Sequence, residues 1–326
     1  MGLSLPLTQL RLQPAMDALA AIVPTDIPSI YEPTTAAANA LHEPHRASIE
    51  SIPRRRFKYG PDERHNLDVY YPPPSESKVP VLVYIHGGAF VAGAARPMSL
   101  VYANLGAHFA RTAGALVLVP EYRLAPGAQY PAGAADVRSA LEWAVSHARE
   151  IAEEDGGEGE RYDWERVWLS GHSAGAIHAA TILLDPAVLP LDDPLRARIK
   201  KLVLLAAPMH FRSENTGPGP LMYYGSPEAI ETHQPLALLE NASPEVLRAL
   251  PGIYMVEAER DPEFVKAGAE DWRVAFGERV GAVGAKGELV VVRAAGHNHL
   301  SLVWFIGGGE AGGDGWVEGL IRWLQH

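Results

Sequence analysis

A serine flanked by glycines is the clearest candidate for chemistry in this sequence. The segment Gly171-His172-Ser173-Ala174-Gly175 matches a Gly-x-Ser-x-Gly pattern. It follows a strand-like stretch at 166–169 and precedes a run of small, helix-compatible residues. A serine on such a strand–turn–helix bend projects its hydroxyl forward, and the flanking glycines let the strand and the helix pack closely. We therefore predict that Ser173 is a catalytic nucleophile.

A serine hydroxyl is a weak nucleophile at neutral pH, so it needs a histidine base that is oriented by a carboxylate. Further along the chain, one strand-like stretch ends near Asp261 and the next ends in Gly296-His297-Asn298-His299. The resulting order of serine, acid and histidine is the one found when the serine lies on this kind of bend. Asp261 is the preferred acid because it is short and directly follows its strand. Spacing does not choose between His297 and His299 as the base.

The same reaction needs backbone N–H groups that stabilise the oxygen on which negative charge develops. The segment His86-Gly87-Gly88-Ala89 directly follows a continuous apolar run at 79–85. A glycine-rich turn after a buried strand exposes N–H groups without obstruction from side chains. The N–H of Ala174, directly after the serine, complements this turn. We expect the two together to form an oxyanion hole.

Strands and helices alternate along most of the chain, and this alternation predicts how the candidate residues are brought together. Apolar, strand-like stretches lie at 79–85, 115–120, 166–169, 201–207, 253–256 and 289–292. Helices are expected at 100–112, about 131–152, 263–276 and 316–325. Such alternation implies one doubly wound, mostly parallel sheet. Ligands of these sheets bind at the carboxyl ends of the strands, where the candidate residues fall.

Three further stretches complete the expected domain organisation. Residues 1–50 are rich in alanine and proline, and we expect one or two short helices there, forming an N-terminal cap segment. Residues 51–326 are expected to form the α/β domain, which begins with antiparallel edge strands at 56–59 and 67–71. Within it, residues from about 208 to 251 have no sheet pattern, and we interpret them as an inserted covering segment.

The composition excludes several kinds of partner and cofactor. The net charge of −11 argues against binding to nucleic acid or to an anionic membrane. The absence of cysteine excludes thiol catalysis, disulfides and cysteine-ligated metals. The glycine-rich segment 307–312 matches a dinucleotide-binding pattern but lacks the βαβ context, so we expect no cofactor and no metal. Without a secretory signal or an apolar run of membrane-spanning length, a cytoplasmic location is expected.

Several motifs together resemble the α/β-hydrolase superfamily over roughly residues 55–326. They are His86-Gly87-Gly88-Ala89-Phe90, Tyr122-Arg123-Leu124-Ala125-Pro126, Tyr130-Pro131-Ala132 and the Gly-x-Ser-x-Gly segment. The most similar branch contains the hormone-sensitive-lipase-type carboxylesterases and the kynurenine formamidases, or arylformamidases. The resemblance implies the α/β-hydrolase fold with a cap segment and hydrolysis of an ester or an amide.

The resemblance also implies a role for individual residues. It makes Ser173 the nucleophile, Asp261 the acid, and the N–H groups of Gly88, Ala89 and Ala174 the oxyanion donors. Formamidase-like members end in an Asp-His-Phe-type segment, with which His299-Leu300 aligns better than His297-Asn298. His299 is therefore the expected base and His297 the second choice. Two positions depart from the family pattern, because Ala89 replaces a third glycine and Glu121 stands where an aspartate is usual.

These observations lead to three hypotheses about function. The first is a serine hydrolase that cleaves carboxylic esters of small or aromatic substrates through an acyl-enzyme. The second is an arylformamidase that removes a formyl group from an aromatic amine. The third is a non-catalytic binding protein of the hydrolase fold, which we would expect to have lost a member of the triad. The expected partner is a small ester or amide molecule, and the oligomeric state is left open, a homodimer included.

Overall fold

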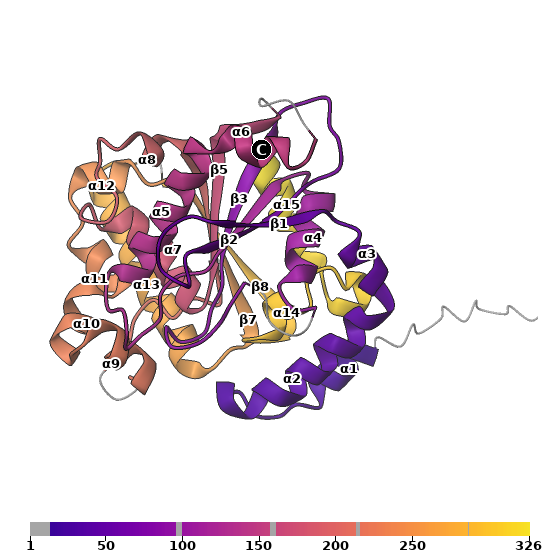
Figure 1. The fold of residues 1–326 in the computed structure, drawn as a ribbon. Helices are drawn as coiled ribbons and strands as arrows, with labels where there is room; N and C mark the ends of the chain where they lie inside the picture. The colour runs from indigo at the N-terminus through magenta and orange to yellow at the C-terminus, as the bar shows by residue number, and fades with distance from the viewer. Residues whose placement is uncertain (1–13, 96–99, 157–160, 213–215, 286) are drawn as a thin grey trace, which may run out of the picture.

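The computed structural model describes residues 14–95, 100–156, 161–212, 216–285 and 287–326. Eight strands form one sheet in the order β1-β2-β4-β3-β5-β6-β7-β8 (Figure 1). The strands are β1 (Arg54–Lys58), β2 (Asn66–Tyr70), β3 (Val79–Ile85), β4 (Leu116–Pro120), β5 (Tyr162–His172), β6 (Ile199–Leu205), β7 (Gly252–Arg260) and β8 (Leu289–Asn298). The β1–β2 and β2–β4 pairs are antiparallel and all the others are parallel. The predicted mostly parallel sheet with an antiparallel edge is confirmed.

Helices cover both faces of the sheet (Figure 1). One face packs against α5 (Ala132–Ser146), α6 (Ala148–Glu153), α7 (Ala174–Leu184), α8 (Pro194–Arg198), α11 (Pro235–Glu240), α12 (Pro244–Arg248) and α13 (Glu263–Ala282). The other face packs against α1 (Pro14–Ala20), α2 (Ile27–His42), α3 (Arg46–Glu50), α4 (Ala103–Thr112), α14 (Ser301–Trp304) and α15 (Gly315–Gln325). Two further helices, α9 (Pro218–Tyr224) and α10 (Pro227–His233), adjoin a smaller aromatic cluster, and η1 (Glu43–His45) and η3 (Gly309–Gly312) are 3-10 helices.

Strand β3 shows why the central strands are apolar throughout. All seven of its residues are buried. Successive side chains of a strand point to opposite faces, so Val81 and Val83 enter the core on one face while Leu82 and Tyr84 enter the core on the other. A strand covered by helices on both faces therefore reads as an unbroken apolar run, which is the pattern that predicted it.

The helix expected at about 131–152 is two helices in the structure. Helix α5 ends at Ser146 and α6 begins at Ala148, with His147 in a non-helical conformation between them. The imidazole of His147 stacks on Trp143 at 4.3 Å, and its Nδ1 lies 2.8 Å from the Trp143 carbonyl oxygen. Buried residues continue in helical spacing across the break, so apolar periodicity did not indicate it.

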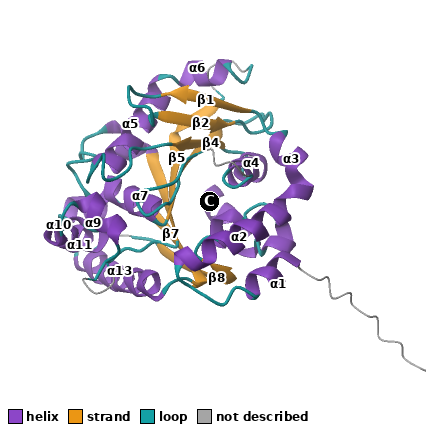
Figure 2. Ribbon diagram, turned by 60° about the horizontal axis from the view of Figure 1, so that its bottom comes forward, coloured by secondary structure: helices purple, strands orange, loops and turns teal. Residues whose placement is uncertain are grey.

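The two expected covering segments lie on different sides of the sheet. Figure 2 shows α2, from the N-terminal segment, to the right of β7, and α9, α10 and α11, from residues 208–251, to its left. The first thirteen residues of the N-terminal segment lie outside the described part of the chain. None of the helices in the described ranges has both the length and the apolar character needed to cross a membrane.

Candidate active site

Ser173 lies on a sharp bend between β5 and α7. Its backbone angles are φ 53° and ψ −121°, a conformation that residues with a side chain rarely adopt. The bend is fixed because the N–H of Ser173 donates a hydrogen bond to the carbonyl of Leu205 on β6, at 2.9 Å. A Cβ atom on Gly171 would lie 2.2 Å from the carbonyl oxygen of Gly175, and one on Gly175 would lie 2.2 Å from that of Ile85. The two glycines of the motif are therefore required by close backbone approach.

The structure brings Ser173, Asp261 and His299 together at the carboxyl ends of three strands. His299 Nδ1 lies 2.8 Å from Asp261 Oδ1, and His299 Nε2 lies 2.9 Å from Ser173 Oγ. The second oxygen of Asp261 accepts the N–H of Ala258 at 2.9 Å. Asp261 and His299 are 1% exposed and Ser173 is 8% exposed. With Nδ1 protonated and held by Asp261, Nε2 is free to accept the serine proton.

His297 has different surroundings from His299. Its Nδ1 lies 3.2 Å from Ser301 Oγ and its Nε2 lies 3.4 Å from the carbonyl oxygen of Gly313. Its ring packs edge-to-face against Phe305 with ring centres 6.1 Å apart. Burial lowers the pKa of this imidazole. Of the two candidate bases, His299 is the one that the structure places against the serine.

The turn after β3 presents backbone N–H groups beside the serine. Gly88, Ala89 and Phe90 have positive φ angles of 133°, 49° and 68°. A Cβ atom on Gly87 would lie 3.1 Å from Ser173 Cβ, so the turn passes directly against the bend that carries the serine. No described residue accepts a hydrogen bond from the N–H of Gly88, Ala89 or Ala174. These three donors are available to an oxygen atom bound next to the serine.

His86, the first residue of this turn, is held by the fold. Its Nδ1 lies 2.8 Å from the carbonyl oxygen of Gly87, and its ring stacks on Tyr122 with centres 4.5 Å apart. The Tyr122 hydroxyl donates to the carbonyl oxygen of His86 at 2.8 Å. Burial lowers the pKa of His86 to about 4, so the ring is neutral at pH 7. These contacts fix the position at which the turn leaves the strand.

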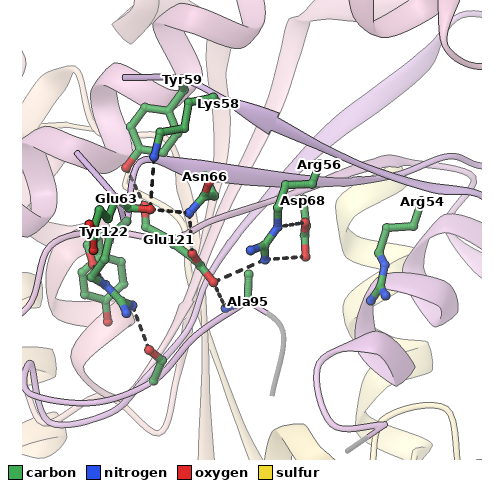
Figure 3. Close-up of polar contacts among 12 residues, drawn as sticks. Arg54, Arg56, Lys58, Tyr59, Glu63, Asn66, Asp68, Ala95, Glu121 and Tyr122 are labelled. Atoms are coloured by element: carbon green, nitrogen blue, oxygen red, sulfur yellow. Dashed lines mark hydrogen bonds and ion pairs between the residues drawn. The ribbon is translucent and has the colours of Figure 1, made fainter. Parts of the chain in front are cut away.

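Sequence reasoning missed how the far end of this turn is anchored. Glu121 lies directly after β4, and Figure 3 shows its carboxylate between Asn66 on one side and Arg56 and Ala95 on the other. One carboxylate oxygen accepts the N–H of Ala95 at 3.2 Å, and the Arg64 guanidinium donates to the Gly93 carbonyl at 2.8 Å. A charged residue directly after a buried strand was the signal that could have indicated this anchor.

A cavity of about 340 Å³ opens onto the serine and the histidine. Besides Ser173, His299 and the turn after β3, its walls include Ile27, Tyr31, Thr35, Tyr102, Leu300 and Trp304. The first three lie on α2, so the N-terminal segment forms one wall of the cavity, and the other lining residues come from outside 208–251. None of the described lining residues is Asp, Glu, Lys or Arg. The sequence predicted a cap but gave no sign of which helix faces the serine.

His172 connects the bend that carries the serine to the segment that carries the histidine. Its Nε2 lies 2.8 Å from the carbonyl oxygen of His299, and the two rings are 4.9 Å apart. Burial, and after it electrostatic repulsion between the two imidazoles, lowers the pKa of His172 to about 3. His172 is therefore neutral, and it donates from Nε2 to that carbonyl.

Comparisons with known proteins find relatives that match this chain over segments of different length. The chain is 34% identical to "Probable carboxylesterase 4, mitochondrial" of Arabidopsis thaliana over 148 residues, which is 43% of this chain and 38% of that protein. It is 27% identical to "Esterase LipI" of Mycobacterium tuberculosis over 274 residues, which is 75% of this chain and 71% of that protein. The matched part thus spans about two fifths of the plant relative and a larger share of the bacterial one.

Solved structures share the fold at low sequence identity. An esterase of Pyrobaculum calidifontis superposes with a TM-score of 0.61 at 20% identity, covering 92% of both chains. Carboxyl esterase 2 of Tuber melanosporum gives a TM-score of 0.61 at 20% identity, covering 84% of this chain and 85% of the other. The alpha/beta hydrolase fold family matches residues 82–301, about two thirds of the chain. The chain therefore belongs to the α/β-hydrolase fold family.

Proposed function

We propose that this protein is a serine hydrolase that cleaves carboxylic esters through an acyl-enzyme intermediate. The observation that carries the proposal is the continuous path of hydrogen bonds from Asp261 through His299 to Ser173 at the wall of a cavity. A nucleophile, a base and a group that orients the base within hydrogen-bond reach are what acyl transfer by serine requires. The relatives named as carboxylesterases and esterases support ester hydrolysis as the reaction class.

The proposed mechanism gives each group a role. His299 Nε2 removes the proton from Ser173 Oγ as that oxygen attacks the carbonyl carbon of the ester. Asp261 keeps the imidazole in the required tautomer and stabilises the imidazolium that forms. The N–H groups of Gly88, Ala89 and Ala174 stabilise the negative oxygen. His299 then gives its proton to the leaving alcohol, and water attacks the acyl-enzyme by the same steps with His299 again as base.

The cavity favours an uncharged substrate with a small or aromatic group. Its described walls carry aromatic and aliphatic side chains, and Tyr31 and Trp304 meet edge-to-face with ring centres 5.5 Å apart. N-formylkynurenine carries an ammonium and a carboxylate, and no described lining residue offers either group an oppositely charged side chain. We therefore place an ester ahead of a formamide as the substrate.

The test is a hydrolysis panel with matched serine variants. We expect turnover of p-nitrophenyl esters with short acyl chains, measured beside longer esters, feruloyl esters and N-formylkynurenine. Ser173→Ala should abolish turnover and leave the circular dichroism spectrum unchanged. Ser51→Ala, which changes an exposed serine, should leave turnover unchanged. Undiminished activity of Ser173→Ala would refute the serine mechanism, and a wild-type protein inactive on the whole panel would favour a non-catalytic binding protein.

Two histidine variants test the proposed base. His299→Ala should lower kcat by about 10⁶-fold, because the serine loses its proton acceptor. His297→Ala removes a buried ring that contacts Ser301 and should lower stability more than kcat. A large loss of kcat in His297→Ala with His299→Ala still active would reverse the assignment.

A further inference from the structure

Helix α2 contacts the active site with two neighbouring faces. Ile27, Tyr31 and Thr35 are spaced four residues apart and line the cavity beside Ser173. Thr34 lies on the adjacent face, is 0% exposed and does not line the cavity. The same helix therefore forms a wall of the cavity and sends a buried hydroxyl toward the segment that carries the histidine.

The partner of that hydroxyl is Asn298, the residue before the proposed base. Thr34 Oγ1 lies 2.9 Å from Asn298 Nδ2, and both residues are 0% exposed. The side-chain oxygen Oδ1 of Asn298 accepts the N–H groups of Leu300 at 3.1 Å and Ser301 at 2.9 Å. These two donors fix the orientation of the amide, so its NH₂ group faces Thr34 and the threonine oxygen accepts.

The proposed base lies inside the turn that this amide organises. His299 stands between Asn298 and Leu300, and the N–H of Asn298 donates to Ser301 Oγ at 3.0 Å. The side-chain oxygen of Asn298 therefore holds the turn, and its NH₂ group is held by Thr34. We propose that Thr34 is a positioning residue that acts through Asn298 to keep His299 in line with Ser173, an inference that rests on the proposed function.

Loss of this contact should change the rate of the chemical steps more than substrate binding. Without the threonine hydroxyl, a buried amide N–H of Asn298 loses its acceptor, and the amide gains by turning toward another group. Such a turn would release the N–H groups of Leu300 and Ser301 and shift His299 between them. Displacement of a catalytic group by about 1 Å can lower a rate by about 10²-fold. Thr34 does not line the cavity, so the walls that bind the substrate stay in place.

The test compares Thr34→Val, which keeps the shape and removes the hydroxyl, with Thr34→Ser, which keeps the hydroxyl. We expect Thr34→Val to lower kcat about tenfold with KM within about twofold of wild type, and Thr34→Ser to restore most of the rate. Phosphorylation of Ser173 by paraoxon should slow by a similar factor, because the serine needs its base to attack the phosphorus and the p-nitrophenolate that leaves needs no proton. Thr181→Val is the matched control, since this buried hydroxyl has no hydrogen-bond partner among the described residues.

A double-mutant cycle tests the route through Asn298. Asn298→Ala alone should lower kcat, and adding Thr34→Val to it should have little further effect. Additive losses, a wild-type kcat in Thr34→Val, or a failure of Thr34→Ser to restore the rate would overturn the positioning role. Ser173→Ala separates the two proposals. Turnover retained in that variant defeats the proposed function, whereas its loss together with a wild-type Thr34→Val defeats only this inference.

Discussion

Glu121 anchors the end of the turn after β3, and Glu121→Gln tests whether this anchor needs a charged group with two accepting oxygens. Three donors converge on the Glu121 side chain. One oxygen accepts Arg56 Nη2 at 3.3 Å and the N–H of Ala95 at 3.2 Å, and the other accepts Asn66 Nδ2 at 3.0 Å. A carboxylate accepts on both oxygens, whereas an amide has one oxygen and one NH₂ group. Whichever way the glutamine turns, its NH₂ group faces a donor.

The expected loss of stability follows from these contacts. The Glu121 side chain is 9% exposed, so solvent screens its ion pair with Arg56 only weakly. The substitution removes one hydrogen bond, worth about 1 kcal/mol, and weakens a charge-assisted one, worth about 1.5–3 kcal/mol when fully formed. Arg56 keeps its pairing with Asp68 at 2.7 Å. We expect the free energy of unfolding to fall by about 2–3 kcal/mol, and Tm to fall by about 3–5 °C.

Urea denaturation followed by circular dichroism measures this loss, with Glu153→Gln as the control. Glu153 pairs with Arg149 on the surface of α6, where the two side chains are 56% and 86% exposed. Its substitution should cost less than about 0.5 kcal/mol. If Glu121→Gln costs no more than Glu153→Gln, then the convergence of donors on Glu121 does not stabilise the fold, and our account of the anchor is wrong.

Three further predictions concern pH, packing and specificity. Burial lowers the pKa values of His86, His172 and His178 to about 4, 3 and 3, so below pH 6.5 the unfolded chain binds protons that the folded chain does not. As the pH falls from about 6.5 to 4, each of these histidines should lower the free energy of unfolding by up to about 1.4 kcal/mol per pH unit. His178→Gln should remove the contribution of one histidine, which urea titrations at pH 7, 6 and 5 would measure. Gly175→Ala should prevent folding, seen as loss of the native circular dichroism signal, because the new Cβ would lie 2.2 Å from a β3 carbonyl oxygen. Tyr31→Ala should raise KM for aryl esters about threefold or more in steady-state kinetics, with little change in kcat.

Local sequence patterns were sufficient to predict the sheet and the strand ends at which the site lies. The apolar run at 79–85 coincides with β3, because a strand buried on both faces needs an apolar residue at every position. The glycines at 171 and 175 were informative for a similar reason. Each stands where a Cβ atom would collide with backbone, so the glycines of the Gly-x-Ser-x-Gly motif indicate where two backbone segments approach closely. Such local constraints can be seen in a single sequence.

The choice between the two histidines could not be made from spacing. His297 and His299 are two residues apart, and residues at that spacing point to the same side of an extended chain. β8 continues to Asn298, and His299 is the first residue beyond it. Contacts made by segments distant in sequence separate the two rings, since His299 meets Asp261 whereas His297 lies near Gly313.

The covering segment at 208–251 contained signals that were not used. Each of its four helices, α9 to α12, begins with a proline, and Ser226 and Ser243 cap two of them. These residues could have divided the segment into helices. No comparable signal existed for the contact between α2 and the segment that carries His299, because Thr34 and Asn298 are 264 residues apart in sequence.

The candidate active site concentrates backbone strain that the rest of the fold must hold in place. Among the described residues, five that are not glycine have positive φ angles: Ala89, Phe90, Tyr102, Ser173 and Ala206. Three of these line the cavity that opens onto the serine, and each such conformation costs about 1–3 kcal/mol. Hydrogen bonds to neighbouring segments oppose relaxation, as the N–H of Ser173 bonds β6 and the Phe90 carbonyl accepts the N–H of Ala125. The proposed donors and the proposed nucleophile are thus held in position before a substrate binds, so the proposed reaction would need little reorganisation.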